Sequence, residues 1–319
     1  MEKLVVIALG GNALQVSGEE PTYDNQRKNV EVATTRIVEL IESGYKVVIT
    51  HGNGPQVGRM LIQQAKAESE ETPSFPFDAV DAMSQATIGY QIEQVLQNAL
   101  RKRGIDKKVT TVLTQVVVDR EDEAFADPTK PIGPFYTEAE VQELAATSGY
   151  TFKPDSDRGY RRVVASPEPV KIVELDSIKA LIDNGDVVVC CGGGGIPVFD
   201  TDAGYEGTAA VIDKDKATNL LAKKLQADYL VILTAVREAA IHYGTAQQQN
   251  LNTVTVAEMI KYASEGHFAP GSMLPKVEAT IDFTTVTGNK AIITTLDAVL
   301  DAVETGRVGT IITNNHESD

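Results

Sequence analysis

The chain has 319 residues and a formal net charge of −16, with 42% apolar and 23% charged residues. These proportions are typical of an ordinary folded protein, and the length suits two lobes that share one sheet or two closely packed domains. The acidic excess argues against nucleic acids and anionic membranes as partners. No apolar run reaches the length of a membrane span, and no signal-peptide pattern precedes the first strand, so we expect a cytoplasmic protein.

The first 118 residues alternate between apolar runs and amphipathic helical patterns. Leu4 to Leu9 is apolar throughout, as in a strand that is covered on both faces. The segment from Asn29 to Ser43 places its apolar residues on one helical stripe, which Gly44 ends. This alternation predicts an α/β protein with a mainly parallel sheet. The expected elements are strands at 4–9 and 46–49, a β-rich stretch at 109–118, and helices at 29–43 and 84–103.

Glycine-rich turns follow three of the apolar strands. Gly10-Gly11-Asn12 follows the first strand, Gly52-Asn53-Gly54 follows the second, and four glycines at 192–195 follow the apolar residues 187–191. Ligands of open parallel sheets bind beyond the carboxyl ends of the strands. We therefore expect the three turns to converge on one crevice.

The segment from Asp119 to Pro167 departs from this alternation. It is rich in acids, prolines and glycines, it carries Lys130, and a capping-box pattern starts a short helix at Thr137. We interpret it as a flap or small subdomain outside the sheet. A lid over an active site and a contact between subunits are equally compatible with the sequence.

Regular alternation resumes after the flap segment and leads to Asp213-Lys214-Asp215. Exposed glycine amides at 192–195 can form a nest for an anion, and flanking carboxylates can hold Lys214 in place, which together predict a phosphate site. A tight turn followed by a solvated ion pair is the alternative. The remaining expected elements are helices near 177–184, 216–225 and 297–304, a helix that opens at Thr255, a helix from Pro275 towards Gly288, and strands at 229–234, 291–293 and 309–312.

The two cysteines, Cys190 and Cys191, are adjacent in an expected strand. Their side chains are therefore predicted to point to opposite faces, which makes them poor disulfide partners. Two cysteines are also too few for a zinc site. We expect both thiols to be buried and reduced.

Three lysines occupy positions from which a phosphoryl group can be neutralised. Lys214 lies between two carboxylates, Lys276 opens an expected helix, and Lys130 lies in the flap segment. A lysine in any one of these positions is usually just a solvated charge. Phosphoryl transfer requires fixed positive charge and amide donors around the moving group. The sequence contains neither a Walker A motif nor a dinucleotide-binding glycine motif after the first strand. Its four histidines lack metal-ligand spacing, so no metal held by protein ligands is expected.

Six motifs in this order resemble those of the carbamate kinases of the amino acid kinase superfamily. The resemblance extends from the first expected strand to the last. The motifs are Ala8-Leu9-Gly10-Gly11-Asn12-Ala13, Gly52-Asn53-Gly54-Pro55-Gln56, Lys130-Pro131-Ile132-Gly133, Gly192 to Pro197, Val211-Ile212-Asp213-Lys214-Asp215, and Gly271-Ser272-Met273-Leu274-Pro275-Lys276.

The resemblance implies a three-layer αβα sandwich around a mainly parallel open sheet, with a flap subdomain protruding at about 119–167. Residues 1–185 would form an N-terminal lobe for carbamate or carbamoyl phosphate, and residues 186–319 a C-terminal lobe for the nucleotide. It also implies a homodimer that transfers a phosphoryl group reversibly between ATP and carbamate with Mg²⁺. In the fermentation of arginine, agmatine or allantoin, this reaction runs towards ATP.

The same resemblance assigns roles to the matching residues. Lys214 and Lys276 would neutralise the transferring phosphoryl group, and Asp215 would orient these lysines. Lys130 would bind the substrate. Other members of the superfamily have a lysine where this chain has Ala8, and Lys130 would supply that positive charge instead. This difference favours carbamate over N-acetylglutamate as the substrate. The substrate would contact Gly10, Gly11, Asn12, Gly52, Asn53 and Gly54, and the nucleotide would contact Gly193, Gly194, Gly195, Ala235, Tyr243 and Met273.

One stretch departs from the family pattern. Many carbamate kinases have Thr-Asp-Val-Asp where this chain has Thr234-Ala235-Val236-Arg237, at the border of the expected nucleotide pocket. Two other functions fit parts of the sequence: another acyl-phosphate kinase of the same fold, and a non-catalytic nucleotide-sensing subunit. Ala8 together with Lys130 argues against the first, and the presence of all three lysines argues against the second.

Overall fold

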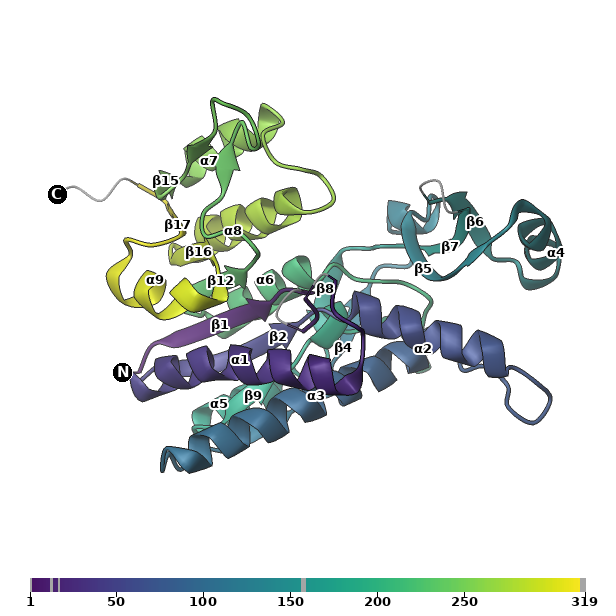
Figure 1. The fold of residues 1–319 in the computed structure, drawn as a ribbon, viewed down its shortest axis with the longest axis horizontal. Coiled ribbons are helices and arrows are strands. Elements are labelled where there is room, and N and C mark those ends of the chain that lie inside the picture. The colour runs from purple at the N-terminus through teal and green to yellow at the C-terminus, as the bar shows by residue number, and fades with distance from the viewer. Residues whose placement is uncertain (1, 12–13, 17, 156–158, 316–319) are drawn as a thin grey trace.

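The computed structural model describes residues 2–11, 14–16, 18–155 and 159–315. Its main sheet has eight strands in the order β15-β17-β16-β12-β1-β2-β9-β3 (Figure 1). Neighbouring strands in it are parallel except β16 and β17, which confirms the mainly parallel α/β prediction. The strands are β1 (Leu4–Leu9), β2 (Lys46–His51), β3 (Val109–Thr111), β9 (Val187–Val189), β12 (Tyr229–Leu233), β15 (Thr253–Thr255), β16 (Lys290–Thr294) and β17 (Thr310–Thr313).

Helices cover both faces of this sheet, as the three-layer prediction requires. Val6 and Ala8 of β1 pack into one core, whereas Val5, Ile7 and Leu9 pack into the other. A strand that is buried on both faces has no polar side, which explains its continuous apolar sequence. One face carries α1 (Tyr23–Glu42), α3 (Phe77–Lys102) and α9 (Val299–Thr305), and the other carries α5 (Leu175–Asp183), α6 (Lys214–Leu225), α7 (Val256–Ser264) and α8 (Met273–Thr287).

The flap segment forms a separate unit that projects from the sandwich (Figure 1). Its three strands pair antiparallel in the order β5-β7-β6, and its helix α4 begins with the predicted capping box at Thr137. Ile132 of the flap packs against Val57, Met60 and Leu61 of α2, so the flap rests on that helix. The elements are α2 (Gly54–Ala67), β5 (Lys130–Tyr136), α4 (Glu138–Ser148), β6 (Thr151–Pro154) and β7 (Tyr160–Val164).

Two smaller sheets complete the description. The larger has the strand order β11-β10-β4-β8, and the smaller is the hairpin β13-β14. Their strands are β4 (Gln115–Val118), β8 (Pro169–Ile172), β10 (Ile196–Thr201), β11 (Gly204–Gly207), β13 (Ala240–Ile241) and β14 (Gln249–Asn250). None of the helices in the described ranges combines the length and hydrophobicity that a bilayer crossing requires.

Several element boundaries differ from the sequence prediction. Helix α2 was not predicted, because Gly54 and Pro55 suggest a loop. Proline is nevertheless favourable in the first turn of a helix, since its fixed φ suits the helix and its missing N–H is not needed there. Helix α1 begins at Tyr23 and α3 at Phe77, each earlier than expected. The β-rich stretch divides into β3 and β4, which belong to different sheets.

The prediction that Cys190 and Cys191 point to opposite faces is wrong. Strand β9 ends at Val189, and Cys191 has a φ of 49°, so the alternation of a strand does not continue through the pair. Both cysteines are buried in the same core, and both are free thiols, as expected. The neighbouring Cys191 thiol and burial raise the pKa of Cys190 well above its usual value.

Candidate active site

The carboxyl ends of β1 and β2 meet at one carbonyl group. Leu9 O accepts a hydrogen bond from Gly52 N at 3.2 Å and another from Lys214 Nζ at 3.4 Å. A Cβ on Gly10 would lie 2.8 Å from Leu233 O, so β12 also ends beside this point. The predicted convergence of the first two glycine turns is therefore present. Asn12 lies outside the described residues.

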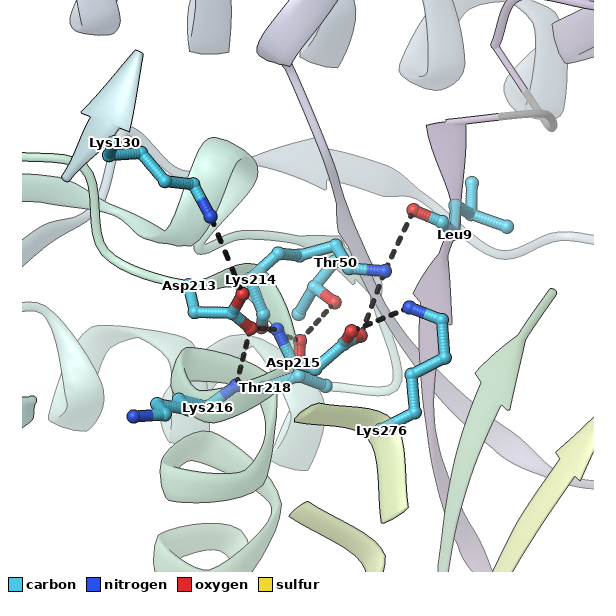
Figure 2. A network of polar contacts seen from close by, with 9 residues as sticks. All are labelled: Leu9, Thr50, Lys130, Asp213, Lys214, Asp215, Lys216, Thr218 and Lys276. Carbon is cyan, nitrogen blue, oxygen red and sulfur yellow. Dashed lines mark hydrogen bonds and ion pairs between the residues drawn. The ribbon is translucent and has the colours of Figure 1, made fainter. Parts of the chain in front are cut away.

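A carboxylate holds two lysine side chains beside these turns. Asp215 Oδ1 lies 2.9 Å from Lys214 Nζ, and Asp215 Oδ2 accepts a hydrogen bond from Lys276 Nζ at 2.8 Å. Figure 2 shows the two ammonium groups approaching the carboxylate from α6 and α8. Asp215 is 4% exposed, and the side chains of Lys214 and Lys276 are 13% and 16% exposed. The three charges are thus held at fixed positions at the edge of solvent.

The electrostatics of this cluster favour the ionised carboxylate. Burial alone would raise the pKa of Asp215, but Lys214 and Lys276 more than offset that effect and hold the pKa below its usual value. Asp215 is therefore an anion at neutral pH, and it remains able to orient both lysines.

Lys214 is the first residue of helix α6, whereas the sequence suggested that it directly follows a strand. Asp213 is the N-cap of α6, and its Oδ1 accepts from Asp215 N at 2.9 Å and Lys216 N at 3.4 Å. This cap places Lys214 and Asp215 in the first helical turn, where their side chains leave the core towards the glycine turns. Thr218 Oγ1 donates to Lys214 O at 2.7 Å, and the Thr218 hydroxyl lies 2.7 Å from that of Thr50, which ties α6 to β2 (Figure 2). No pattern in the sequence indicated the Thr50–Thr218 contact.

The flap lysine reaches the same cluster. Lys130 Nζ lies 3.9 Å from Asp213 Oδ2, although the two residues are far apart in the sequence (Figure 2). The Lys130 side chain is 42% exposed, so it is the most accessible of the three lysines. The structure therefore brings together all four residues predicted to be catalytic: Lys130, Lys214, Asp215 and Lys276.

Two adjoining cavities open beside the lysines. The smaller, of about 280 Å³, is lined by Gly10, Gly11 and Lys276 among others. The larger, of about 570 Å³, includes Tyr243 and Met273 in its wall. Thr234, Ala235 and Ser272 line both cavities, so the two share a wall. Thr234 and Ala235, which begin the stretch that departs from the family pattern, thus stand between them.

The four glycines at 192–195 contact the Gly52–Gly54 turn but line neither of the two cavities. They are buried, and the amides of Gly194 and Gly195 donate to the carbonyls of Cys191 and Gly192, so these two amides are not free to form an anion nest. A Cβ on Gly193 would lie 2.2 Å from Asn53 Nδ2. The glycine turn therefore packs behind the Gly52–Gly54 turn, apart from the cavity that contains Tyr243 and Met273.

His51 lies behind the same turn. Its Nδ1 is 3.0 Å from Gly52 O, and burial lowers its pKa from 6.5 to about 4. His51 is therefore neutral at pH 7 and shapes the turn. Within the described residues, no group of three or more His, Cys, Asp or Glu side chains is arranged to hold a metal ion.

Comparisons with known proteins agree with this geometry. The sequence profile of the Amino acid kinase family matches residues 3–295. The chain is 49% identical to the carbamate kinase of Pyrococcus horikoshii, covering 98% of this chain and 100% of the relative, and 51% identical to carbamate kinase 3 of Staphylococcus aureus, covering 97% and 99%. The structure of Giardia lamblia carbamate kinase bound to AMP-PNP superimposes with a TM-score of 0.94 at 46% identity, covering 98% of each chain. The chain therefore belongs to the amino acid kinase family and, within that family, to the carbamate kinases.

Proposed function

We propose that this protein transfers a phosphoryl group from carbamoyl phosphate to ADP, giving ATP and carbamate, and that it also catalyses the reverse reaction. The observation that supports this most directly is the position of Lys214 and Lys276. One buried carboxylate fixes both ammonium groups beside the Gly10–Gly11 and Gly52–Gly54 turns and next to a two-part cavity.

The chemistry needs positioning and positive charge more than it needs a base. A terminal oxygen of ADP attacks the phosphorus atom, the bond between phosphorus and the carbamoyl oxygen breaks, and carbamate leaves as an anion without a proton transfer. Negative charge spreads over the phosphoryl oxygens during transfer, and fixed cations stabilise it. In this proposal Lys214 and Lys276 neutralise the phosphoryl group, Asp215 orients them, and Lys130 grips the carbamoyl end.

The two cavities suggest how the substrates divide the site. The nucleotide base and ribose would occupy the larger cavity near Ala235, Tyr243 and Met273, with the phosphates directed past Thr234 towards Lys276. The carbamoyl phosphate would lie against the turns at the ends of β1 and β2. This arrangement corresponds to an N-terminal substrate lobe and a C-terminal nucleotide lobe.

Mg²⁺ would enter as the metal–nucleotide complex. This ion usually keeps several waters and binds substrate phosphates with few protein ligands. The described residues offer no three-residue cage, and the carboxylates nearest the lysines, Asp213 and Asp215, are already paired with cations. The nucleotide phosphates are therefore the expected ligands.

We also propose a homodimer in the cytoplasm, where adenine nucleotides are abundant. Met83 and Tyr90 on α3 and Leu113, just after the edge strand β3, are between 37% and 53% exposed and offer an apolar face for a second copy. The direction towards ATP fits breakdown of arginine, agmatine or allantoin, as the family resemblance implies.

The test is ATP formation from ADP, Mg²⁺ and fresh carbamoyl phosphate, with acetyl phosphate as a second donor and a blank without enzyme. Rapid ATP formation with carbamoyl phosphate alone would support the proposal. ATP from acetyl phosphate at a similar rate would favour another acyl-phosphate kinase, and nucleotide binding without any turnover would favour a sensing subunit.

A further inference from the structure

A buried polar cluster joins the side chain of Asn53, in the Gly52–Gly54 turn, to Asp81 and Ser84 of α3, two residues that have no part in the mechanism above. Asn53 Nδ2 donates to Asp81 Oδ1 at 2.5 Å and to Ser84 Oγ at 2.7 Å. Ser84 Oγ in turn donates to Asp81 O at 2.8 Å. Asn53 and Asp81 are each 5% exposed and Ser84 is fully buried. Buried polar groups are costly unless they are paired, so this cluster restrains the Asn53 side chain strongly.

Asn53 does not make the contact that its position would ordinarily give it. It is the N-cap residue of α2, where asparagine is favoured because its side chain accepts from amides of the first turn. No such hydrogen bond is present here, and the side chain turns inward to α3. Asp81 and Ser84 of α3 therefore set the position of Asn53 and leave the mouth of the turn without a side-chain cap.

The glycine turn at 192–195 completes the enclosure of Asn53. Gly193 has a φ of 69°, and a Cβ there would lie 2.2 Å from Asn53 Nδ2, so only glycine leaves room for the asparagine. Gln85, the residue after Ser84, donates from Nε2 to Gly192 O at 2.9 Å. Helix α3 thus holds both Asn53 and the turn that packs against it.

We propose that Asp81 is a positioning residue that fixes Asn53, and through Asn53 the Gly52–Gly54 backbone, in the conformation that receives carbamoyl phosphate. This inference rests on the proposed function. It assigns Asp81 no contact with substrate: Asp81 acts through the turn, whose Gly52 lies beside the Lys214 side chain.

The charge state of Asp81 matters because the turn faces an anion. Burial raises the pKa of Asp81 from 3.8 to about 8, Asn53 lowers it in part, and the charge of Asp78 on the same helix raises it further. His51 on β2 is neutral at pH 7, and Lys214 is the cation across the turn. A neutral Asp81 leaves the field of the lysines intact, whereas ionisation above about pH 8 adds negative charge behind the substrate turn.

The test compares three variants with the wild type in the ATP-forming assay, measuring KM for carbamoyl phosphate and KM for ADP separately. Asp81→Leu removes the acceptor, and Asp81→Asn keeps an acceptor oxygen but cannot ionise. Glu93→Leu is the matched control, because Glu93 lies further along α3 and accepts from Thr111 N at 2.8 Å. Circular dichroism and urea titration establish that each variant is folded.

The expected result is specific to one substrate. Asp81→Leu raises KM for carbamoyl phosphate by about ten-fold or more, as the loss of a buried hydrogen bond predicts, while KM for ADP stays within about two-fold. Asp81→Asn restores the KM for carbamoyl phosphate near pH 7 and removes the rise in that KM which the wild type shows above about pH 8. Glu93→Leu changes neither KM.

Other results would overturn the inference. These are an unchanged KM for carbamoyl phosphate in a folded Asp81→Leu variant, an equal change in both KM values, or an alkaline rise that persists in Asp81→Asn. If Asp81→Leu does not fold, the pH profile of Asp81→Asn decides alone. Failure of the wild type to use carbamoyl phosphate would instead refute the proposed function.

Discussion

Replacing Asp215 with asparagine is the most informative single change, because it removes one negative charge and keeps the shape of the side chain. In the wild type this carboxylate is 4% exposed and lies 2.9 Å from Lys214 Nζ and 2.8 Å from Lys276 Nζ. Without it the two ammonium groups lose their common partner and repel each other. We expect the lysines to separate and the phosphoryl group to lose fixed positive charge.

The burial of Asp215, Lys214 and Lys276 determines how much stability the Asp215→Asn variant should lose. Removing one partner of a fully buried ion pair costs about 3–5 kcal/mol, because it leaves an uncompensated charge. Both lysine side chains retain some contact with solvent, so we expect a loss of stability near the lower limit, about 3 kcal/mol. Turnover should fall by about 10²-fold or more, as when one preorganised donor to a developing anion is lost.

The effect of Asp215→Asn on stability should depend on pH in one direction. The pKa of Asp215 is held below its usual value in the folded protein, so the carboxylate stabilises the fold above the unfolded pKa of about 4. The stability difference between wild type and Asp215→Asn should therefore be constant from about pH 6 to 8. It should shrink as the pH falls below about 4, when the wild-type carboxyl takes up a proton.

A matched control lies on the same two helices. Asp282 of α8 pairs with Lys223 of α6 and also accepts from Asn219 Nδ2 at 2.5 Å, but its side chain is 46% exposed. Asp282→Asn should cost about 1 kcal/mol or less and leave turnover unchanged. Urea titration and the ATP-forming assay measure both effects. A folded Asp215→Asn variant with wild-type turnover, or with the same small effect as the control, would refute the assignment of Asp215 as the residue that orients the lysines.

Three further predictions concern other residues. Lys130→Ala should lower turnover by about 10²-fold with a stability change below about 1 kcal/mol, since this lysine is 42% exposed and 3.9 Å from Asp213; an unaltered rate would contradict its role. The pKa of His51 is about 4 in the fold against 6.5, so the stability of the wild type relative to His51→Gln should fall by about 3 kcal/mol as the pH falls from about 6.5 to 4, and urea titrations of the two proteins measure this difference; a constant difference would contradict the burial of a neutral imidazole. Cys190 and Cys191 are 1% and 0% exposed, so a disulfide reagent that reports thiols by absorbance should detect neither in the native protein and both in urea; fast reaction of the native protein would contradict their burial.

Local patterns in the sequence were sufficient for the main architecture. The continuous apolar run of β1 indicated a strand covered on both faces, and the structure divides its side chains between two cores. Helix α2 was missed because glycine and proline at its start suggest a loop. The helical spacing of Val57, Met60 and Leu61 was the available signal, and these side chains pack against Ile132 of the flap.

Only part of the candidate site could be predicted from the sequence. Lys214 and Asp215 were recognisable because they are adjacent, and Lys276 because it belongs to a family motif. Asp81 gave no signal, since an acid on an amphipathic helix is usually solvated and its contact with Asn53 joins residues 28 positions apart. The glycines at 192–195 suggested an anion nest, but they are required for another reason: His51, Asn53, Ile212 O and Val116 occupy the space where their Cβ atoms would lie.

The charge pairing around Lys214 also explains how so acidic a chain can bind anions. Three lysines and two aspartates form the cluster, which leaves it a net charge of +1 although the whole chain carries −16. Three unpaired ammonium groups in the same space would repel one another and would be free to move, so part of the binding energy would be lost in ordering them. Asp213 and Asp215 remove most of that repulsion before the substrate arrives. Asp215 holds Lys214 and Lys276 through its two carboxylate oxygens, and Asp213 fixes the first turn of α6 by accepting from the amides of Asp215 and Lys216. The aspartates therefore reduce the attraction of the site for any anion and increase its selectivity for a phosphoryl group that fits between the lysines.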